Sequence, residues 1–172
     1  KKRKVDAKPW YRARVSIVGS EIDDPSLTKM IEDVGAFVVS DRYCFGSTPG
    51  REVIELNDQE DALTQICRHC MQVSECARYI ADDKVAQRRA TADRLAREFR
   101  ADGIIYEQMK FCDYWGFERA LVSHIMNEEM GWPVLSIDRP YNARSSGQLR
   151  TRFQAFVESL EIKRIQKEGG KQ

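Results

Sequence analysis

The sequence predicts an α/β domain with an open, mostly parallel four-stranded sheet and helices on both faces. Two patterns lead to this prediction: four short apolar runs suited to buried strands, and amphipathic helical stretches between them. The chain has 172 residues, of which 42% are hydrophobic, a size and composition that suit one globular domain. Strands separated by helices imply right-handed crossovers and parallel pairing.

The first strand and helix are predicted from an apolar run followed by a helical repeat. Residues 15–18 include β-branched side chains and are closed by a glycine, which is typical of a buried strand. A helix is predicted over 24–35, because an Asp-Pro pair opens it and a glycine ends it. A second strand is predicted at 36–39, followed by the polar and aromatic segment 40–46. The apolar face of the helix over 24–35 comprises Leu27, Met30, Ile31 and Val34.

The rest of the chain continues this alternation. Residues 59–80 are weakly patterned but predicted to be helical, and a clearer helix is predicted over 82–100. The third and fourth strands are predicted at 104–106 and 133–137. Their pattern is typical of a Rossmann- or flavodoxin-like three-layer sandwich. Further helices are predicted between the third and fourth strands and after the fourth strand. The predicted inner faces comprise Val85, Ala92, Leu95, Ala96 and Phe99 in the helix over 82–100, Phe117, Leu121, Val122 and Ile125 in the helix before the fourth strand, and Leu149, Phe153, Phe156, Val157 and Leu160 in the helix after it.

The domain is expected to have short flanking segments. We expect residues 1–13 to be a linker, 14–163 to form the α/β domain and 164–172 to be a flexible tail. The run Lys1–Val5 resembles a nuclear localisation signal, but a solvated linker is the simpler interpretation. Because the first residue is lysine and no signal-peptide pattern follows it, we expect a piece of a longer protein.

Composition and missing motifs exclude several classes of protein. No apolar run approaches the roughly 20 residues of a membrane-spanning helix. The 28 Lys+Arg nearly balance the 27 Asp+Glu, which argues against general nucleic-acid binding. Five scattered cysteines favour a reducing, cytoplasmic compartment over a disulfide framework. The chain also lacks a P-loop, a dinucleotide-binding glycine motif, a serine-hydrolase elbow and a ferredoxin-like cysteine run.

The residues after each predicted strand are the candidate site, because ligands bind outside the carboxyl ends of strands in open α/β sheets. A thiol, carboxylates and cations gathered there suit a soft metal or a reactive group. Two cysteines, Cys44 and Cys112, fall in these segments. The segments are 19–21, 42–46, 107–112 and 138–139.

Each cysteine also has a simpler interpretation. Cys112 opens a predicted helix, whose N-terminus favours a thiolate, but a buried and inert cysteine is equally compatible with this position. The same holds for Cys44, which lies between two aromatic residues.

A zinc site is the weaker interpretation of the remaining cysteines. Cys67 and Cys70 form a C-x-x-C pair near His69 and Cys76, but no second pair of ligands lies at zinc-finger spacing. We therefore predict helix-packing residues there. His124 is likewise expected to be a packed residue and not a base.

Six segments in one order resemble the C-terminal α/β domain of the 2-hydroxyacyl-CoA dehydratase and benzoyl-CoA reductase family. The resemblance covers about residues 14–160, and segments 42–46 and 49–51 are more similar to the benzoyl-CoA reductase branch. The six segments are 17–25, 31–39, 41–46, 102–105, 110–112 and 147–152.

This resemblance implies an iron–sulfur cofactor whose ligands come only in part from this chain. Cys112 matches a cluster ligand, Cys44 matches a position near the cluster or substrate, and Lys110 would tune the cluster. The other ligands of a 4Fe-4S cluster would come from an N-terminal domain, so no cofactor is expected on the isolated fragment. Glu107 and Tyr43 are candidate proton donors.

The function implied is low-potential electron transfer to an aromatic CoA thioester, as part of a benzoyl-CoA reductase, an oxidoreductase. The implied partners are a homologous subunit of a hetero-oligomer and an ATP-hydrolysing iron–sulfur activator, in the cytoplasm of an anaerobic bacterium or archaeon. The first alternative is a 2-hydroxyacyl-CoA dehydratase subunit, a lyase that uses its electron catalytically. The second is a non-catalytic flavodoxin-like assembly or binding module.

Overall fold

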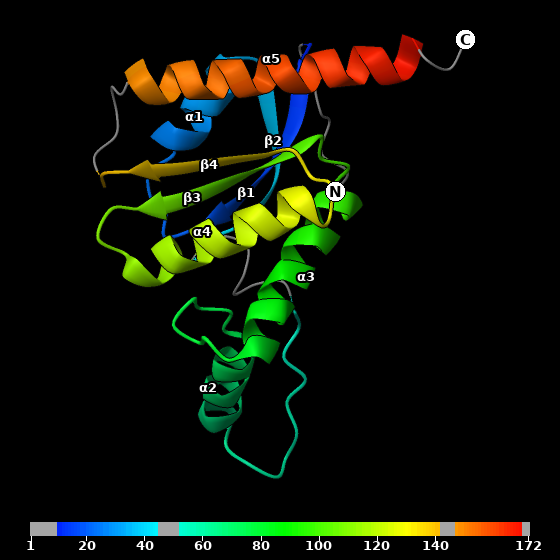
Figure 1. Ribbon diagram of the computed structural model, residues 1–172. Coiled ribbons are helices and arrows are strands. Elements are labelled where there is room, and N and C mark those ends of the chain that lie inside the picture. The colour runs from blue at the N-terminus through cyan, green and yellow to red at the C-terminus, as the bar shows by residue number, and fades with distance from the viewer. Residues whose placement is uncertain (1–9, 45–51, 142–146, 170–172) are drawn as a thin grey trace.

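The four predicted strands are present and form one parallel sheet (Figure 1). The computed structural model describes residues 10–44, 52–141 and 147–169. In this part of the chain the strand order is β2-β1-β3-β4, and every neighbouring pair is parallel. The strands are β1 (Ala13–Gly19), β2 (Ala36–Arg42), β3 (Gly103–Met109) and β4 (Val134–Arg139).

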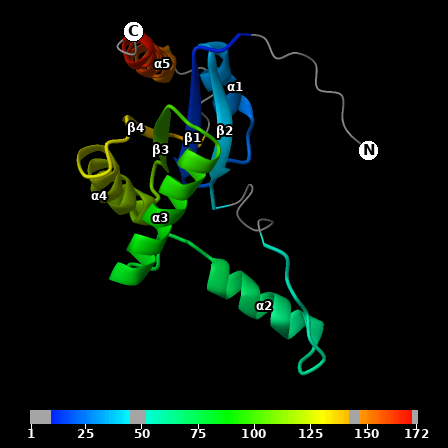
Figure 2. The same cartoon turned by 90° about the vertical axis from the view of Figure 1, so that its right-hand side faces the viewer.

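Helices cover both faces of the sheet, as the sequence predicts. Figures 1 and 2 show α1 and α5 on one face and α3 and α4 on the other. Helix α2 stands apart from the sheet, beyond the end of α3. The helices are α1 (Ser26–Asp33), α2 (Ala62–Val73), α3 (Asp82–Glu98), α4 (Asp113–Glu128) and α5 (Gly147–Gly169).

Two hydrophobic cores lie on the opposite faces of the sheet. Because side chains alternate along a strand, Ile105 packs with α1 and α5 while its neighbours Ile104 and Tyr106 pack with α3 and α4. All three side chains are completely buried. This burial on both faces explains why the strands read as continuous apolar runs in the sequence.

Helix α4 differs from the sequence prediction in the face that it buries. Phe117 and Leu121, predicted to point inward, are 78% and 47% exposed. Val122 is buried as the sequence predicts, and Trp115 and Met126 accompany it on the buried side. The helix has apolar side chains on both sides, so periodicity alone could not identify the side that meets the sheet.

Helix α2 is shorter than the stretch 59–80 that the sequence predicts. It begins after Asp61, whose side chain accepts a hydrogen bond from the backbone N–H of Thr64 and so caps the helix. Its apolar residues Leu63 and Met71 are mostly exposed, and Cys67 and Cys70, which the sequence predicts to be packed, are exposed as well.

The order in which the strands are added to the sheet reverses at β1, in the centre of the sheet. Strand β1 pairs with β2 on one side and with β3 on the other. The crevice outside the carboxyl ends of β1 and β3 is therefore a topological switch point. Gly19, at the end of β1, lies directly beside Glu107 of β3. A Cβ at Gly19 would lie 2.0 Å from the Glu107 carbonyl oxygen, so this close approach requires glycine.

The last helix continues to Gly169, past residue 163, where we expect the domain to end. Among the described residues, none of the helices has the length and apolar character needed to cross a membrane.

Candidate functional site

A buried carboxylate occupies the switch point. Glu107 is completely buried, and its Oε1 lies 2.7 Å from Nε of Arg139 at the end of β4. Its Oε2 hydrogen-bonds with the hydroxyl of Ser20, 3.2 Å away at the end of β1. Arg139 also donates to the backbone carbonyl of Glu21 at 2.7 Å. Three strand ends are thus joined through one carboxyl group.

Burial favours the protonated form of the Glu107 carboxyl group. Loss of hydration raises the pKa of Glu107 to about 7, although Arg139 and the hydrogen bond from Ser20 oppose the change. A carboxyl group with such a pKa exists in both protonation states near neutral pH. It can therefore give or accept a proton in catalysis.

Tyr43 belongs to the same neighbourhood. Its side chain is buried in the core between the sheet and the α1–α5 layer. Burial raises the pKa of its hydroxyl, and the charges of Asp41, Glu107 and Arg139 also act on it. The phenol is therefore held in its protonated form. The structure brings both predicted proton donors, Tyr43 and Glu107, to the same end of the sheet.

Cys112 lies on a strained turn between β3 and α4. Its backbone N–H donates to the Met109 carbonyl at 3.0 Å, and its own carbonyl accepts from Gly116 in the first turn of α4. Phe111, just before it, has φ of 73°, which is a costly conformation for a bulky residue. The Cys112 side chain packs against the α3–α4 core but is only partly buried.

Cys44 follows β2 and contacts an indole from α4. The Nε1–H of Trp115 donates to the Cys44 sulfur at 3.1 Å. Burial raises the pKa of this thiol, the bond from Trp115 lowers it, and the thiols of Cys76 and Cys112 raise it further. The fold therefore brings Cys44, Cys76 and Cys112 into one neighbourhood, although they are far apart in the sequence.

A hollow of about 370 Å³ opens beside these thiols. Its walls come from the end of β2, the end of α2, the connection between α2 and α3, and α4. They include the cysteines Cys44, Cys70 and Cys76, the guanidinium groups of Arg42 and Arg78, and the ring of Trp115.

Lys110, unlike Glu107 and Tyr43, is not buried. Its side chain is half exposed, and its Nζ lies 3.9 Å from a carboxylate oxygen of Asp138. Phe45, Gly46 and the segment 49–51, which contribute to the family resemblance, lie outside the described residues.

Sequence reasoning missed several residues of this site. Ser20 and Arg139 lie in segments that the sequence identifies, but their contacts with Glu107 depend on strand order. Trp115 and Cys76 have no local signal that connects them to Cys44, since they approach it only through packing of the helices. Within the described residues, no three or more His, Cys, Asp or Glu side chains are grouped so that they could hold a metal ion.

Several apolar side chains that precede or follow Cys112 in the sequence are exposed. Phe111 is 97% exposed, and along α4 Tyr114, Phe117 and Leu121 are also exposed. The three helical residues recur at helical spacing, so they form one stripe. An exposed apolar stripe of this kind is typical of a contact with another protein surface.

Comparison with known proteins relates the chain to CoA-thioester dehydratases. Residues 1–160 match the family described as "2-hydroxyglutaryl-CoA dehydratase, D-component". The chain is 29% identical over 157 residues to the "(R)-phenyllactyl-CoA dehydratase beta subunit" of Clostridium sporogenes, covering 91% of this chain and 40% of that protein. It is 27% identical over 154 residues to the "Putative dehydratase subunit YjiM" of Escherichia coli (strain K12), covering 87% of this chain and 38% of that protein. The chain thus spans about two fifths of the length of these curated relatives.

Proposed function

Because the chain belongs to the 2-hydroxyglutaryl-CoA dehydratase D-component family, we propose that it is part of a subunit of a 2-hydroxyacyl-CoA dehydratase. This is the lyase alternative, and the names of the two relatives support it better than the reductase that the motifs favour. The enzyme would remove water from a CoA thioester of a 2-hydroxy acid. One of the relatives is named as a beta subunit, which supports assembly with a second type of subunit.

The observation that carries this proposal is the position of Cys112. Its partly exposed thiol stands at the N-terminus of α4, next to the switch point, where a parallel sheet binds its ligands. A cysteine sulfur is the donor that iron–sulfur clusters use. The donor therefore fits the cofactor that the family resemblance implies, with Cys112 as one ligand and the others from outside the described residues.

The bound cluster would supply a low-potential electron to the thioester of the substrate. The neighbouring residues of this chain would handle protons. Glu107, with a pKa of about 7, can hold or release a proton at its Oε2, and the Ser20 hydroxyl orients this oxygen. The protonated Tyr43 hydroxyl is the second candidate donor. Lys110, which is half exposed two residues before Cys112, offers a positive charge at this edge.

The apolar surface around Cys112 suits the rest of the enzyme. Phe111, Tyr114, Phe117 and Leu121 would contact the part of the subunit, or the partner subunit, that supplies the remaining ligands. Burying Phe111 there would also offset the strain of its backbone. The ATP-hydrolysing activator would deliver electrons to this assembly.

The test is anaerobic iron and acid-labile sulfide analysis of the full-length subunit with its partner. We expect Cys112→Ser to lose the cluster of this subunit and the dehydration of 2-hydroxyacyl-CoA. Cys67→Ser is the matched control, because Cys67 is exposed on α2, and it should retain both. Full iron content in Cys112→Ser would refute the proposed ligand and favour the non-catalytic assembly module.

A benzoyl-CoA reductase subunit remains the second candidate, favoured by the segments 42–46 and 49–51. Counting electrons separates the two reactions. A dehydratase needs only a catalytic amount of electrons, because the electron returns after each turnover. A reductase consumes electrons in proportion to the aromatic CoA thioester that it reduces.

A further inference from the structure

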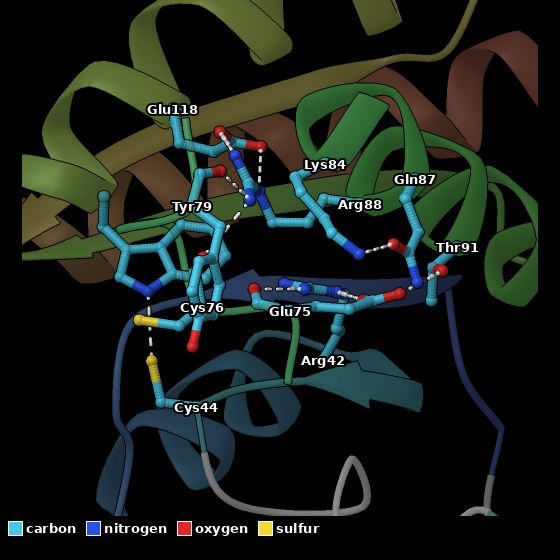
Figure 3. A network of polar contacts seen from close by, with 11 residues as sticks. Arg42, Cys44, Glu75, Cys76, Tyr79, Lys84, Gln87, Arg88, Thr91 and Glu118 are labelled. Carbon is cyan, nitrogen blue, oxygen red and sulfur yellow. Dashed lines mark hydrogen bonds and ion pairs between the residues drawn. The ribbon is translucent and has the colours of Figure 1, made fainter. Parts of the chain in front are cut away.

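Two of the thiols around the hollow are not proposed as cluster ligands, and hydrogen bonds hold the residues that carry them. Cys44 and Cys76 both line the hollow, and Cys76 is one of the groups whose charge acts on Cys44. Figure 3 shows the side chains of Cys44 and Cys76 close together, and Trp115 lines the same hollow. Trp115 is only 2% exposed, and its indole N–H holds the Cys44 sulfur on this side of the hollow.

Cys76 has a cationic neighbour. The Nε–H of Arg78 donates to the Cys76 sulfur at 3.3 Å. This contact places a positive charge directly beside the sulfur that would attack an oxidant. The thiol is partly accessible to solvent, so a small oxidant can reach it.

The loop that carries Cys76 is anchored on both sides. Arg42, at the end of β2, pairs with the carboxylate of Glu75 and donates to its backbone carbonyl at 2.7 Å. Arg88 of α3 donates to the backbone carbonyls of Cys76 and Tyr79 at 3.2 and 2.7 Å. These contacts hold the loop against the end of the strand from which Cys44 extends (Figure 3).

Cys44 differs from Cys76 in a way that suggests a second role. Its sulfur accepts a hydrogen bond from a neutral indole, and burial raises its pKa. It is therefore less suited to attack an oxidant, but it can attack an oxidised neighbour.

We propose that Cys76 and Cys44 form an oxidation site, in which Cys76 reacts with a peroxide and Cys44 then closes a disulfide with it. In the first step the Cys76 thiolate attacks one oxygen of hydrogen peroxide, the O–O bond breaks, and with one proton the products are a sulfenic acid and water. In the second step the Cys44 sulfur attacks the sulfenic sulfur. A disulfide forms, and the hydroxyl leaves as a second water with the proton of Cys44.

The disulfide would link the end of β2 to the connection between α2 and α3, across the hollow. The oxidation site does not depend on the proposed function, because neither Cys44 nor Cys76 is proposed as a cluster ligand. Its failure would therefore leave the dehydratase proposal unchanged.

The test is peptide mapping of the whole chain, free of iron, after reduction and then treatment with equimolar hydrogen peroxide. Trypsin leaves Cys70 and Cys76 on one peptide, 69–78, so a second cleavage after Glu75 is needed to distinguish them. We expect a disulfide between Cys44 and Cys76. In Cys44→Ser we expect a sulfenic acid trapped on Cys76 by dimedone.

Cys70→Ser is the matched control, because Cys70 lines the same hollow and should not be needed. Arg78→Gln should slow formation of the disulfide several-fold while circular dichroism remains unchanged. A disulfide that uses Cys70 or Cys112 in place of either partner would overturn the proposal, and so would five thiols that all remain free to react with an alkylating agent after the treatment.

Discussion

Oε1 of Glu107 lies 2.7 Å from Nε of Arg139, and the two side chains are 0% and 6% exposed. This ion pair connects the ends of β3 and β4 inside the protein. Despite its cationic partner, the carboxyl group has a pKa of about 7, because the loss of hydration outweighs the attraction of Arg139. The pair therefore makes stability depend on pH in the range where enzymes work.

We predict that Glu107 makes the chain less stable as the pH rises. The folded protein holds this proton up to pH of about 7, whereas the unfolded chain releases it near the ordinary value of 4.5. The stabilisation is complete below the lower value and is lost as the pH rises through the higher one. At ~1.4 kcal/mol per pKa unit, it amounts to about 3 kcal/mol.

Urea unfolding at about pH 4 and pH 8 checks this prediction. In Glu107→Gln the fall in the free energy of unfolding between the two pH values should be smaller by about that amount. Glu129→Gln, which alters an exposed carboxylate just after α4, should retain the fall of the unaltered chain. Equal falls in all three proteins would contradict the role of Glu107.

Gly19→Ala should destabilise the fold strongly. The new Cβ would lie 2.0 Å from the backbone oxygen of Glu107 and 2.8 Å from its Oε2, so β1 and β3 could not remain paired at this end. We expect a loss of about 3 kcal/mol in the free energy of unfolding, at the upper end of overpacking effects. Gly147→Ala is the control, because nothing lies within 4 Å of the position that its new Cβ would occupy. A similar result for both variants would show that the sheet can adjust.

Arg88 should be essential only while Glu118 is present. The two form a bidentate buried pair, with distances of 2.7 and 3.0 Å and side-chain exposures of 1% and 5%. Arg88→Leu leaves a buried carboxylate without its partner and should cost about 3–5 kcal/mol. The double variant Arg88→Leu, Glu118→Leu should recover much of this loss, as a double-mutant cycle by chemical denaturation would show.

The exposed pair of Arg94 and Glu98 on α3 provides the comparison. Arg94→Leu should leave the free energy of unfolding almost unchanged, because solvent screens this pair. If the double variant at 88 and 118 is as unstable as Arg88→Leu, the arginine acts through its bonds to the loop carbonyls and not through the carboxylate.

Phe111→Gly should stabilise this chain but weaken assembly of the enzyme. Glycine adopts the observed φ of 73° without strain, which is worth about 1 kcal/mol. The exposed ring contributes little to the fold of this chain, yet in our proposal it contacts the rest of the enzyme. Thermal unfolding and co-purification with the partner subunit measure the two effects.

Arg100→Gly is the control for the strain alone. Arg100 has φ of 50° at the end of α3, away from Cys112, so glycine should raise stability there without changing assembly. If Phe111→Gly assembles as well as Arg100→Gly does, the apolar surface near Cys112 is not an interface.

The strands were the most predictable part of the molecule, and the helix faces were less so. Residues 15–18 and 104–106 are apolar on both sides because both faces of the sheet are covered, so their pattern is local and clear. The prediction that Phe117 and Leu121 are buried was wrong, because α4 has two apolar sides, one packed on the sheet and one on the surface. An isolated repeat contains no information on which of two apolar sides is buried.

The sequence by itself determined the α/β alternation, the four strands and the edge at which Glu107, Tyr43, Cys44 and Cys112 gather. These follow from periodicity within single elements and from the rule that parallel strands end together. Only the tertiary structure decided that Arg139 pairs with Glu107 and that Cys76 lies near Cys44 beside Trp115. Such contacts depend on strand order and helix packing, which arise from interactions between segments far apart in the chain.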